Sequence, residues 1–73
     1  MKRWHTNKTR PLSEERVIVV DTDNDVSIEW TDLDNKGRWF MSWGYRDCSW
    51  KEIKDKIKLW AYVDKYFEKE LNK

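Results

Sequence analysis

Val26-Ser27-Ile28-Glu29-Trp30-Thr31 alternates apolar and polar residues, which is the pattern of a half-buried β-strand. A second strand is expected in Arg38–Tyr45, where the large apolar residues share one face: Trp39, Met41, Trp43 and Tyr45. Between the two strands lies Asp34-Asn35-Lys36-Gly37, a turn sequence in which the glycine can adopt a positive φ. These segments together predict an antiparallel β-hairpin.

The register of this hairpin follows from matching the two apolar patterns. If Leu33 lies opposite Arg38, the large apolar residues of both strands fall on one face, in these pairs: Trp30–Met41, Ile28–Trp43 and Val26–Tyr45. A slip of one residue would pair Trp30 with Ser42 and destroy this match, because every side chain of the strand would move to the other face. We therefore expect Trp30 to lie beside Met41 on the core face.

An apolar β-branched run, Val17–Val20, precedes the hairpin and has the composition of a strand buried on both faces. The acidic segment Asp21–Asp25 follows it and is rich in turn-forming residues. Odd and even loop lengths both fit a strand that is apolar on both faces, so the register of this first hairpin stays open. The three strands together predict an antiparallel meander.

The C-terminal third begins with a helix signal, Ser49-Trp50-Lys51-Glu52, whose hydroxyl and carboxylate can form a capping box. Large apolar residues then recur at steps that place them on one side of a helix: Trp50, Ile53, Ile57, Trp60, Phe67 and Leu71. A competing interpretation ends the helix near Lys58, forms a fourth strand near residues 58–63 and adds a short tail helix. We favour the long helix, because no Pro or Gly interrupts residues 49–73. The predicted fold class is therefore α+β, a three-stranded antiparallel meander packed on a C-terminal helix.

The composition narrows the class of protein. A chain of 73 residues with 15 Lys and Arg against 14 Asp and Glu fits one domain, which we place at residues 10–73 behind a basic N-terminal arm at residues 1–9. No apolar run reaches about 18 residues, and no apolar segment follows the N-terminus, so we predict a cytoplasmic protein without a membrane contact or a secretory signal. A single Cys48 and a single His5 predict neither a disulfide framework nor a zinc site.

Two sequence motifs suggest a calcium site and a catalytic nucleophile, but both are incomplete. Asp21-x-Asp23-x-Asp25 resembles the start of a calcium loop, but Val26 replaces the required glycine and Asp32 replaces the bidentate glutamate. A solvated turn is the simpler interpretation. Cys48 near a helix start could be a nucleophile, but catalysis also needs a base, and His5 belongs to the N-terminal arm. We expect no metal, no cofactor and no enzymatic activity.

Four segments resemble a known pattern: Trp4, Arg10-Pro11-Leu12, Val17–Asp21 and Lys58–Asp64. They are similar to a small Trp-bracketed domain of unknown function that is common in phages and prophages. This chain departs from that pattern, because it lacks a Pro after the closing Trp and has a longer charged tail. The resemblance implies a phage-linked, β-rich domain and favours a strand around the closing Trp. It implies no catalytic residues.

The predicted C-terminal helix has more apolar residues than one face of the sheet can bury. On a long helix, a second stripe beside the core stripe would contain Leu59, Tyr62, Val63 and Tyr66, and Phe40 stands on the otherwise polar sheet face. An exposed patch of this kind usually marks a protein interface, although the first strand and the N-terminal arm could instead cover it. We therefore expect a protein-interaction module, an inhibitor or adaptor that occludes a host or defence protein and forms a homo-oligomer.

An alternative function rests on aromatic residues interleaved with basic ones, which is the composition of a platform for nucleotides or single-stranded nucleic acid. The candidate residues for this function are Lys2, Arg3, Trp4, Arg38 and Arg46. A net charge of +1 argues against a broad phosphate-binding surface, so this function ranks second.

Overall fold

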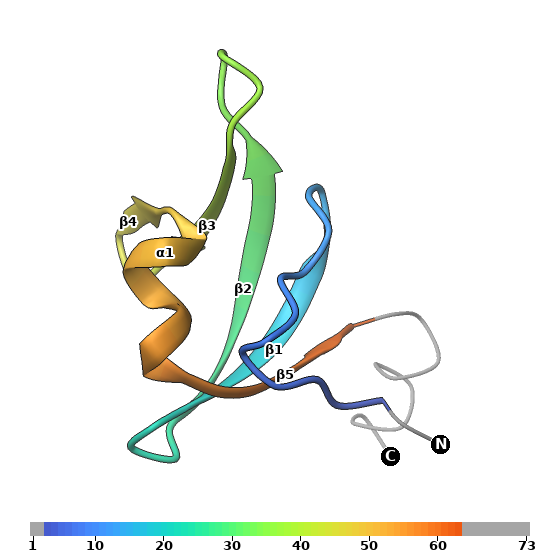
Figure 1. Cartoon of the computed structure of the whole chain (residues 1–73), viewed down its shortest axis with the longest axis vertical. Helices are drawn as coiled ribbons and strands as arrows, with labels where there is room; N and C mark the ends of the chain where they lie inside the picture. Colours follow the sequence, from blue (N-terminus) through green and yellow to red (C-terminus); the bar gives the residue numbers. More distant parts are fainter. Residues whose placement is uncertain (1–2, 64–73) are drawn as a thin grey trace.

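The computed structural model describes residues 3–63, which form a five-stranded antiparallel sheet and one short helical segment (Figure 1). The elements follow one another as β1 (Arg16–Asp21), β2 (Val26–Leu33), β3 (Trp39–Trp43), β4 (Arg46–Cys48), α1 (Trp50–Ile53), the 3-10 helix η1 (Lys54–Lys56) and β5 (Ile57–Tyr62). The strand order across the sheet is β4-β3-β2-β1-β5, so β2 is the central strand. The predicted three-stranded meander packed on a C-terminal helix is therefore wrong.

The helix begins where the sequence predicts and ends much earlier. Ser49 is the N-cap: its Oγ accepts the Glu52 N–H at 3.3 Å, and its own N–H donates to Glu52 Oε1 at 2.9 Å. After Ile53 the chain passes through η1 into β5, which pairs with β1. A helix in place of β5 would leave the backbone of β1 unpaired along one edge, and this favours the strand. No helix within residues 3–63 is long and apolar enough to cross a membrane.

The competing interpretation, a strand near residues 58–63, agrees with the position of β5. Alternation explains why: in a strand Trp60 points to one face and its neighbour Ala61 to the other, and both are fully buried. The remainder of the predicted helix, including the proposed tail helix at residues 64–73, lies outside the described residues.

The β2–β3 register differs by one residue from the predicted one. Trp30 pairs with Ser42, and Thr31 pairs with Met41. Since paired residues point to the same face of a sheet, Thr31 takes the place on the core face that was predicted for Trp30. The side chain of Trp30, together with those of its neighbours Val26 and Ile28, points to the opposite face.

The turn between β2 and β3 explains the shift. The Asp34 N–H donates to the Arg38 carbonyl at 2.8 Å, so three residues, and not four, separate the paired positions. The Asp34 Oδ1 atom accepts the N–H groups of Lys36 and Arg38 at 2.9 and 2.8 Å. Gly37 adopts a φ of 76°, the left-handed conformation typical of three-residue hairpin loops.

The larger of two buried clusters lies on one face of the sheet, which we call the inner face. Its buried residues come from the strands and from the end of α1: Val17, Val19, Trp39, Met41, Cys48, Ile53, Ile57 and Trp60. Figure 1 shows α1 and the N-terminal segment on this same side of the sheet. The core is therefore covered by a short helix and an irregular segment, and not by a long helix.

The N-terminal segment is fixed to the core through indole N–H groups. Trp39 Nε1 donates to the Pro11 carbonyl at 2.9 Å, and Trp60 Nε1 donates to the carbonyls of Thr6 and Thr9 at 3.1 and 2.8 Å. His5 forms an antiparallel bridge with Trp60 and stacks on its ring at a centroid distance of 4.3 Å. Residues 5–9, which the sequence assigns to an N-terminal arm, thus pack directly on β5.

Thr31 is a buried polar residue with a complete set of partners. Its hydroxyl donates to the Leu12 carbonyl at 2.6 Å and accepts the Glu15 N–H at 3.0 Å. These bonds remove the penalty of burying a hydroxyl and tie the N-terminal segment to the central strand. The inward-facing hydroxyl of Thr31 therefore has its hydrogen-bond partners. The side chain of its neighbour Trp30 points to the opposite face.

Candidate functional site

The face of the sheet opposite the core, which we call the outer face, carries the candidate site. Residues paired across antiparallel strands point to the same side, so the strand pairing identifies its members. They are Arg16, Ile18, Val20, Val26, Ile28, Trp30, Asp32, Phe40, Ser42, Asp47, Leu59 and Ala61. The helix α1 and the N-terminal segment lie on the other side of the sheet.

Strand pairing aligns these side chains in rows across the sheet. Two neighbouring rows are entirely apolar, and we call them the apolar rows: Leu59–Val20–Val26 and Ala61–Ile18–Ile28. The next row, which we call the charged row, is Arg16–Trp30–Ser42–Asp47. It has a cation at one end, a carboxylate at the other and an indole between them.

The exposed apolar surface is concentrated on the central strand. The exposed fractions of Val26, Ile28 and Trp30, which we call the β2 patch, are 61%, 45% and 59%. Same-face neighbours on a strand lie about 7 Å apart, so the three side chains are contiguous. Complete burial of side chains of this size stabilises by about 1.5–3 kcal/mol each. A docking partner that buried the exposed fraction of these side chains would gain the corresponding part of this free energy.

Other apolar residues of the outer face are already buried within the chain. Ile18 and Ala61 are buried on this face, and Val63 packs against them. The guanidinium of Arg16 lies over the Trp30 ring at 5.4 Å from its centroid. This cation–π contact favours one orientation of the exposed indole, so the β2 patch is preformed.

The two edges of the sheet are less suited to docking than its outer face. At one edge, β4 contains only three residues. At the other edge, the backbone of β5 is covered at its residue Trp60, because His5 N–H donates to the Trp60 carbonyl at 2.7 Å and Trp60 N–H donates back at 2.9 Å. Short or covered edges prevent another strand from adding to a sheet. A partner would therefore contact the outer face and not extend the sheet.

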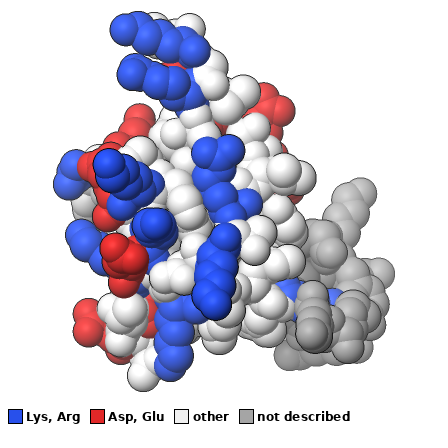
Figure 2. Space-filling model, in the orientation of Figure 1, with Lys and Arg blue, Asp and Glu red and all other residues white. Residues whose placement is uncertain are grey.

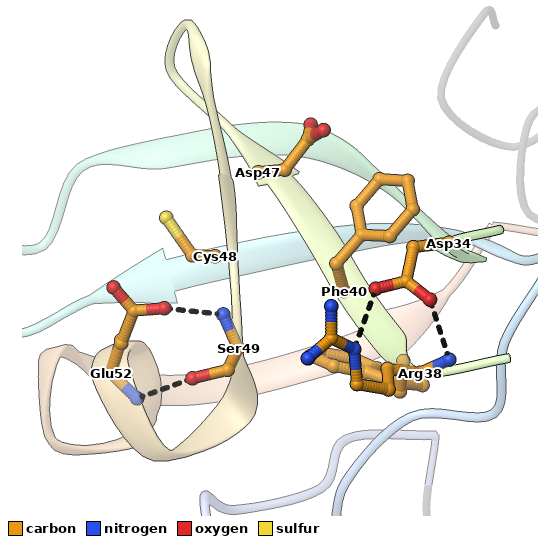
Figure 3. Close-up of a pocket in the computed structure, with 8 residues that line it drawn as sticks. Asp34, Arg38, Phe40, Asp47, Cys48, Ser49 and Glu52 are labelled. Atoms are coloured by element: carbon orange, nitrogen blue, oxygen red, sulfur yellow. Dashed lines mark hydrogen bonds and ion pairs between the residues drawn. The ribbon is translucent and has the colours of Figure 1, made fainter. Parts of the chain in front are cut away.

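A hollow of about 350 Å³ opens between the β2–β3 turn and the start of α1 (Figure 3). It is lined by Asp34, Arg38, Trp39, Phe40, Asp47, Cys48, Ser49 and Glu52. Asp34 Oδ2 pairs with Arg38 Nε at 3.0 Å. A backbone hydrogen bond from Arg38 lowers the pKa of Asp34, and one from Ser49 lowers the pKa of Glu52. These two carboxylates therefore stabilise the turn and the helix cap as anions.

The structure separates the residues that a nucleophilic site would need. Cys48 is a buried thiol on β4. His5 bridges to β5, at the opposite edge of the sheet. The two side chains are thus not brought together as a nucleophile and its base.

The acidic run between β1 and β2 forms a turn. The Asp21 Oδ1 atom accepts the N–H groups of Asp23 and Asp25 at 2.8 and 3.0 Å. A carboxylate that bonds its own following backbone in this way stabilises a tight turn. Among residues 3–63, no group of three or more His, Cys, Asp or Glu side chains is placed to hold a metal ion.

The predicted interface residues do not share one surface. Phe40 and Leu59 lie on the outer face and are partly exposed, and Val63 packs at its margin. Tyr62 points to the inner face, where its ring meets Trp60 edge-on at 4.9 Å. The helical stripe is divided because alternate residues of a strand point to opposite faces. Tyr66 lies outside the described residues.

The residues predicted for nucleic-acid binding lie in two separate places. Arg38 pairs with Asp34 in the β2–β3 turn, and Arg46 on β4 pairs with Glu52 at 3.4 Å. Arg3 and Trp4 directly precede His5, which is bound to β5 at the other edge of the sheet. Lys2 lies outside the described residues. The set therefore does not form one continuous platform.

Sequence reasoning missed the β2 patch, because the expected register put Val26, Ile28 and Trp30 on the core face. One signal could have found it. The sequence Asp34-Asn35-Lys36-Gly37-Arg38 also fits a three-residue loop with glycine in the left-handed position, and this loop reverses the faces of β2 relative to β3.

Comparisons of the chain with protein-family models, with curated proteins and with solved structures found no match. The resemblance to a phage-linked domain therefore stays a prediction.

Proposed function

We propose that this chain is a small, non-enzymatic protein-interaction module that acts in the cytoplasm as an inhibitor or adaptor. It docks a protein partner on its outer face and occludes the surface that it covers. The observation that carries the proposal is the β2 patch, three contiguous apolar side chains that are each about half exposed. Single exposed apolar residues are common on proteins, whereas contiguous ones mark contact surfaces.

The surroundings of the β2 patch support this role. Trp is among the residue types that dominate binding free energies, and Trp30 occupies the central strand of the sheet. Phe40 on β3 and Leu59 on β5 extend the apolar surface to either side. β2 pairs with β1 over residues 26–30 and with β3 over residues 30–33, so the backbone of Trp30 is held on both sides and less conformational entropy is lost there on binding. Occlusion needs only such a preformed surface and no reactive group.

The test compares variants of the outer face with a matched control. Trp30→Thr and Ile28→Thr remove apolar surface and keep residues that suit a strand. Tyr45→Thr is the control, since Tyr45 is a fully exposed aromatic residue in the β3–β4 turn and not in one of the strands. The variants serve as baits in a lysate of the organism that encodes the chain. We expect the wild type and Tyr45→Thr to retain the same protein, with hydrogen exchange of β2 slowed in the complex.

Trp30→Thr and Ile28→Thr should each reduce the capture by about tenfold or more. Capture that is equal for all four proteins would contradict the proposal, because the outer face would then make no contribution. The fold of each variant is checked by its circular dichroism spectrum.

A second candidate function, binding of a nucleotide or single-stranded nucleic acid, is favoured by the charge on the other side of the molecule. Figure 2 shows Lys and Arg side chains over the side that carries α1 and the N-terminal segment. Lys8, Arg10, Lys51 and Lys54 are exposed there. Binding of a labelled single-stranded oligonucleotide should then weaken steeply with salt and should not change in Trp30→Thr. No binding at low salt would exclude this function.

A further inference from the structure

We propose that a hollow on the inner side of the sheet binds a mononucleotide, with the base against Trp43 and the phosphate between Arg46 and Lys56. This site is separate from the docking surface on the outer face, so a ligand in it and a protein partner do not compete for the same residues. The inference rests on the second candidate function, for which it names a site and a ligand.

The hollow has a volume of about 350 Å³ and opens between the β3–β4 hairpin and the helical segment formed by α1 and η1 (Figure 1). Small-molecule sites usually have volumes of about 300–1,000 Å³, so this one suits a single nucleotide better than a longer ligand. We call it the basic hollow, and its lining residues are Trp43, Gly44, Arg46, Cys48, Ile53 and Lys56. Cys48 and Ile53 are buried core residues, so its floor is apolar.

The pairing of β3 with β4 places an indole beside a guanidinium. Trp43 lies directly opposite Arg46, so both side chains point to the same face, with their Cβ atoms about 5 Å apart. The Trp43 side chain is only partly buried. Gly44 follows it with a φ of 66°, and a Cβ placed there would meet no described atom within 4 Å. The space beside Trp43 is therefore open to a flat aromatic ligand, and nucleotide bases stack on indole rings.

The charge of the lining favours an anionic group on this ligand. Lys56 at the end of η1 is held in place by its carbonyl, which accepts the Thr22 N–H at 3.0 Å. Together with Arg46 it gives the basic hollow two cations and no lining carboxylate. The hollow between the β2–β3 turn and the start of α1 has the same volume, about 350 Å³, but its lining contains three carboxylates and one cation. A phosphate is therefore attracted to the basic hollow and repelled from the other one.

One carboxylate near the basic hollow opposes the binding of a phosphate. Glu52 Oε2 contacts Arg46 Nη2 at 3.4 Å, and the two side chains are 51% and 75% exposed. An exposed pair of this kind is weak. Because a guanidinium has five N–H donors, Arg46 can donate to a phosphate and keep this contact. The negative charge of Glu52 still lowers the affinity for a phosphate, and its removal has an effect of known sign.

Titration of the nitrogen-labelled full chain with adenosine monophosphate, followed by nuclear magnetic resonance at low salt, tests the inference. The indole N–H of Trp43 and the amide of Gly44 should shift with a Kd of about 0.1–1 mM. The indole N–H of Trp60, which is bonded to the Thr6 and Thr9 carbonyls, should not shift. Adenosine lacks the phosphate and ribose phosphate lacks the base, so each should bind about tenfold more weakly or less.

Three charge variants test the position of the phosphate. Lys56→Gln should weaken the binding of adenosine monophosphate by about threefold to tenfold. Glu52→Gln should strengthen it by about twofold, and a glutamine at this position still serves the capping box. Lys51→Gln is the matched control, because Lys51 on α1 is exposed but does not line the basic hollow, and it should change the affinity by less than about twofold. Equal losses in Lys51→Gln and Lys56→Gln would overturn the inference, because the affinity would then follow net charge alone.

The inference fails separately from the functions proposed above. It is overturned if adenosine monophosphate shifts neither Trp43 nor Gly44, or if ribose phosphate binds as tightly as the nucleotide. If a single-stranded oligonucleotide still binds in that case, the second candidate function stands and uses another part of the basic side. Trp30→Thr should leave the affinity for adenosine monophosphate unchanged, so the result does not depend on docking at the outer face.

Discussion

Trp30 lies directly opposite Ser42 across the β2–β3 pair, and both side chains stand on the outer face. The indole is 59% exposed, whereas its neighbour Thr31 is buried. A Trp30–Ser42 pair forgoes the apolar contact that a Trp30–Met41 pair would make within the chain. The apolar surface that is not used inside the chain is available to another protein, and this is the physical basis of the docking proposal.

Replacement of the buried hydroxyl should destabilise the fold. Thr31→Val keeps the shape of the side chain but leaves the Leu12 carbonyl and the Glu15 N–H without their partner. We expect a loss of about 1–3 kcal/mol in the free energy of unfolding, measured by urea titration with Trp fluorescence. Thr22→Val, at an exposed turn position, is the control and should change it by less than about 0.5 kcal/mol. Equal stability of Thr31→Val and the wild type would argue against an inward Thr31.

Removal of residues 1–9 should destabilise the sheet by more than about 2 kcal/mol. The truncation deletes both carbonyl acceptors of Trp60 Nε1 and the two backbone hydrogen bonds between His5 and Trp60. Thermal unfolding followed by circular dichroism measures the effect. Lys8→Ala, an exposed position in the same segment, should leave the melting temperature unchanged. A truncated chain as stable as the full one would mean that these residues are only an appended arm.

Acid should weaken the β2–β3 turn and the helix cap. Backbone hydrogen bonds lower the pKa of Asp34 from 3.8 and that of Glu52 from 4.5, so the unfolded chain binds protons at a higher pH than the folded chain does. Their stabilisation is complete above about pH 4.5 and is lost as the pH falls through the lowered pKa values. Asp34→Asn and Glu52→Gln should each make the melting temperature less dependent on pH in this range. An unchanged pH profile would contradict the folded-state bonds of these carboxylates.

Glu29 should show the opposite pH dependence. Burial raises its pKa above 4.5, and a hydrogen bond from the Ser27 side chain partly offsets this rise. Its contribution to stability is therefore greatest below the unfolded pKa and is lost as the pH rises through the raised value. Glu29→Gln should raise the melting temperature at neutral pH and have little effect in acid. A lower melting temperature at neutral pH would show that the carboxylate is better solvated than its position on the inner face implies.

The local signals in the sequence located several elements correctly. The β-branched run Val17–Val20 lies within β1, and the alternating residues Val26–Thr31 lie within β2. The capping box at Ser49 starts α1 as predicted. Each of these signals depends on residues that are close together in the chain, and such patterns are the ones that a single sequence shows best.

The features that the sequence did not predict depend on distant contacts or on one residue in a loop. Ile57 and Trp60 are three residues apart, which fits a helix, but the apolar run from Leu59 to Tyr62 also fits a strand that is buried on both faces. Pairing with β1 decides between the two. The register was decided by whether the loop after Leu33 contains three or four residues. That single difference exchanged the faces of β2 and moved the candidate site from the core to the surface.

The docking surface depends on the β2–β3 register, and cross-strand nuclear Overhauser effects measure this register directly. In spectra of the labelled full chain, backbone contacts should pair Trp30 with Ser42 and Thr31 with Met41. Contacts that pair Trp30 with Met41 would contradict the account, because they would return the β2 patch to the core and leave the outer face without it.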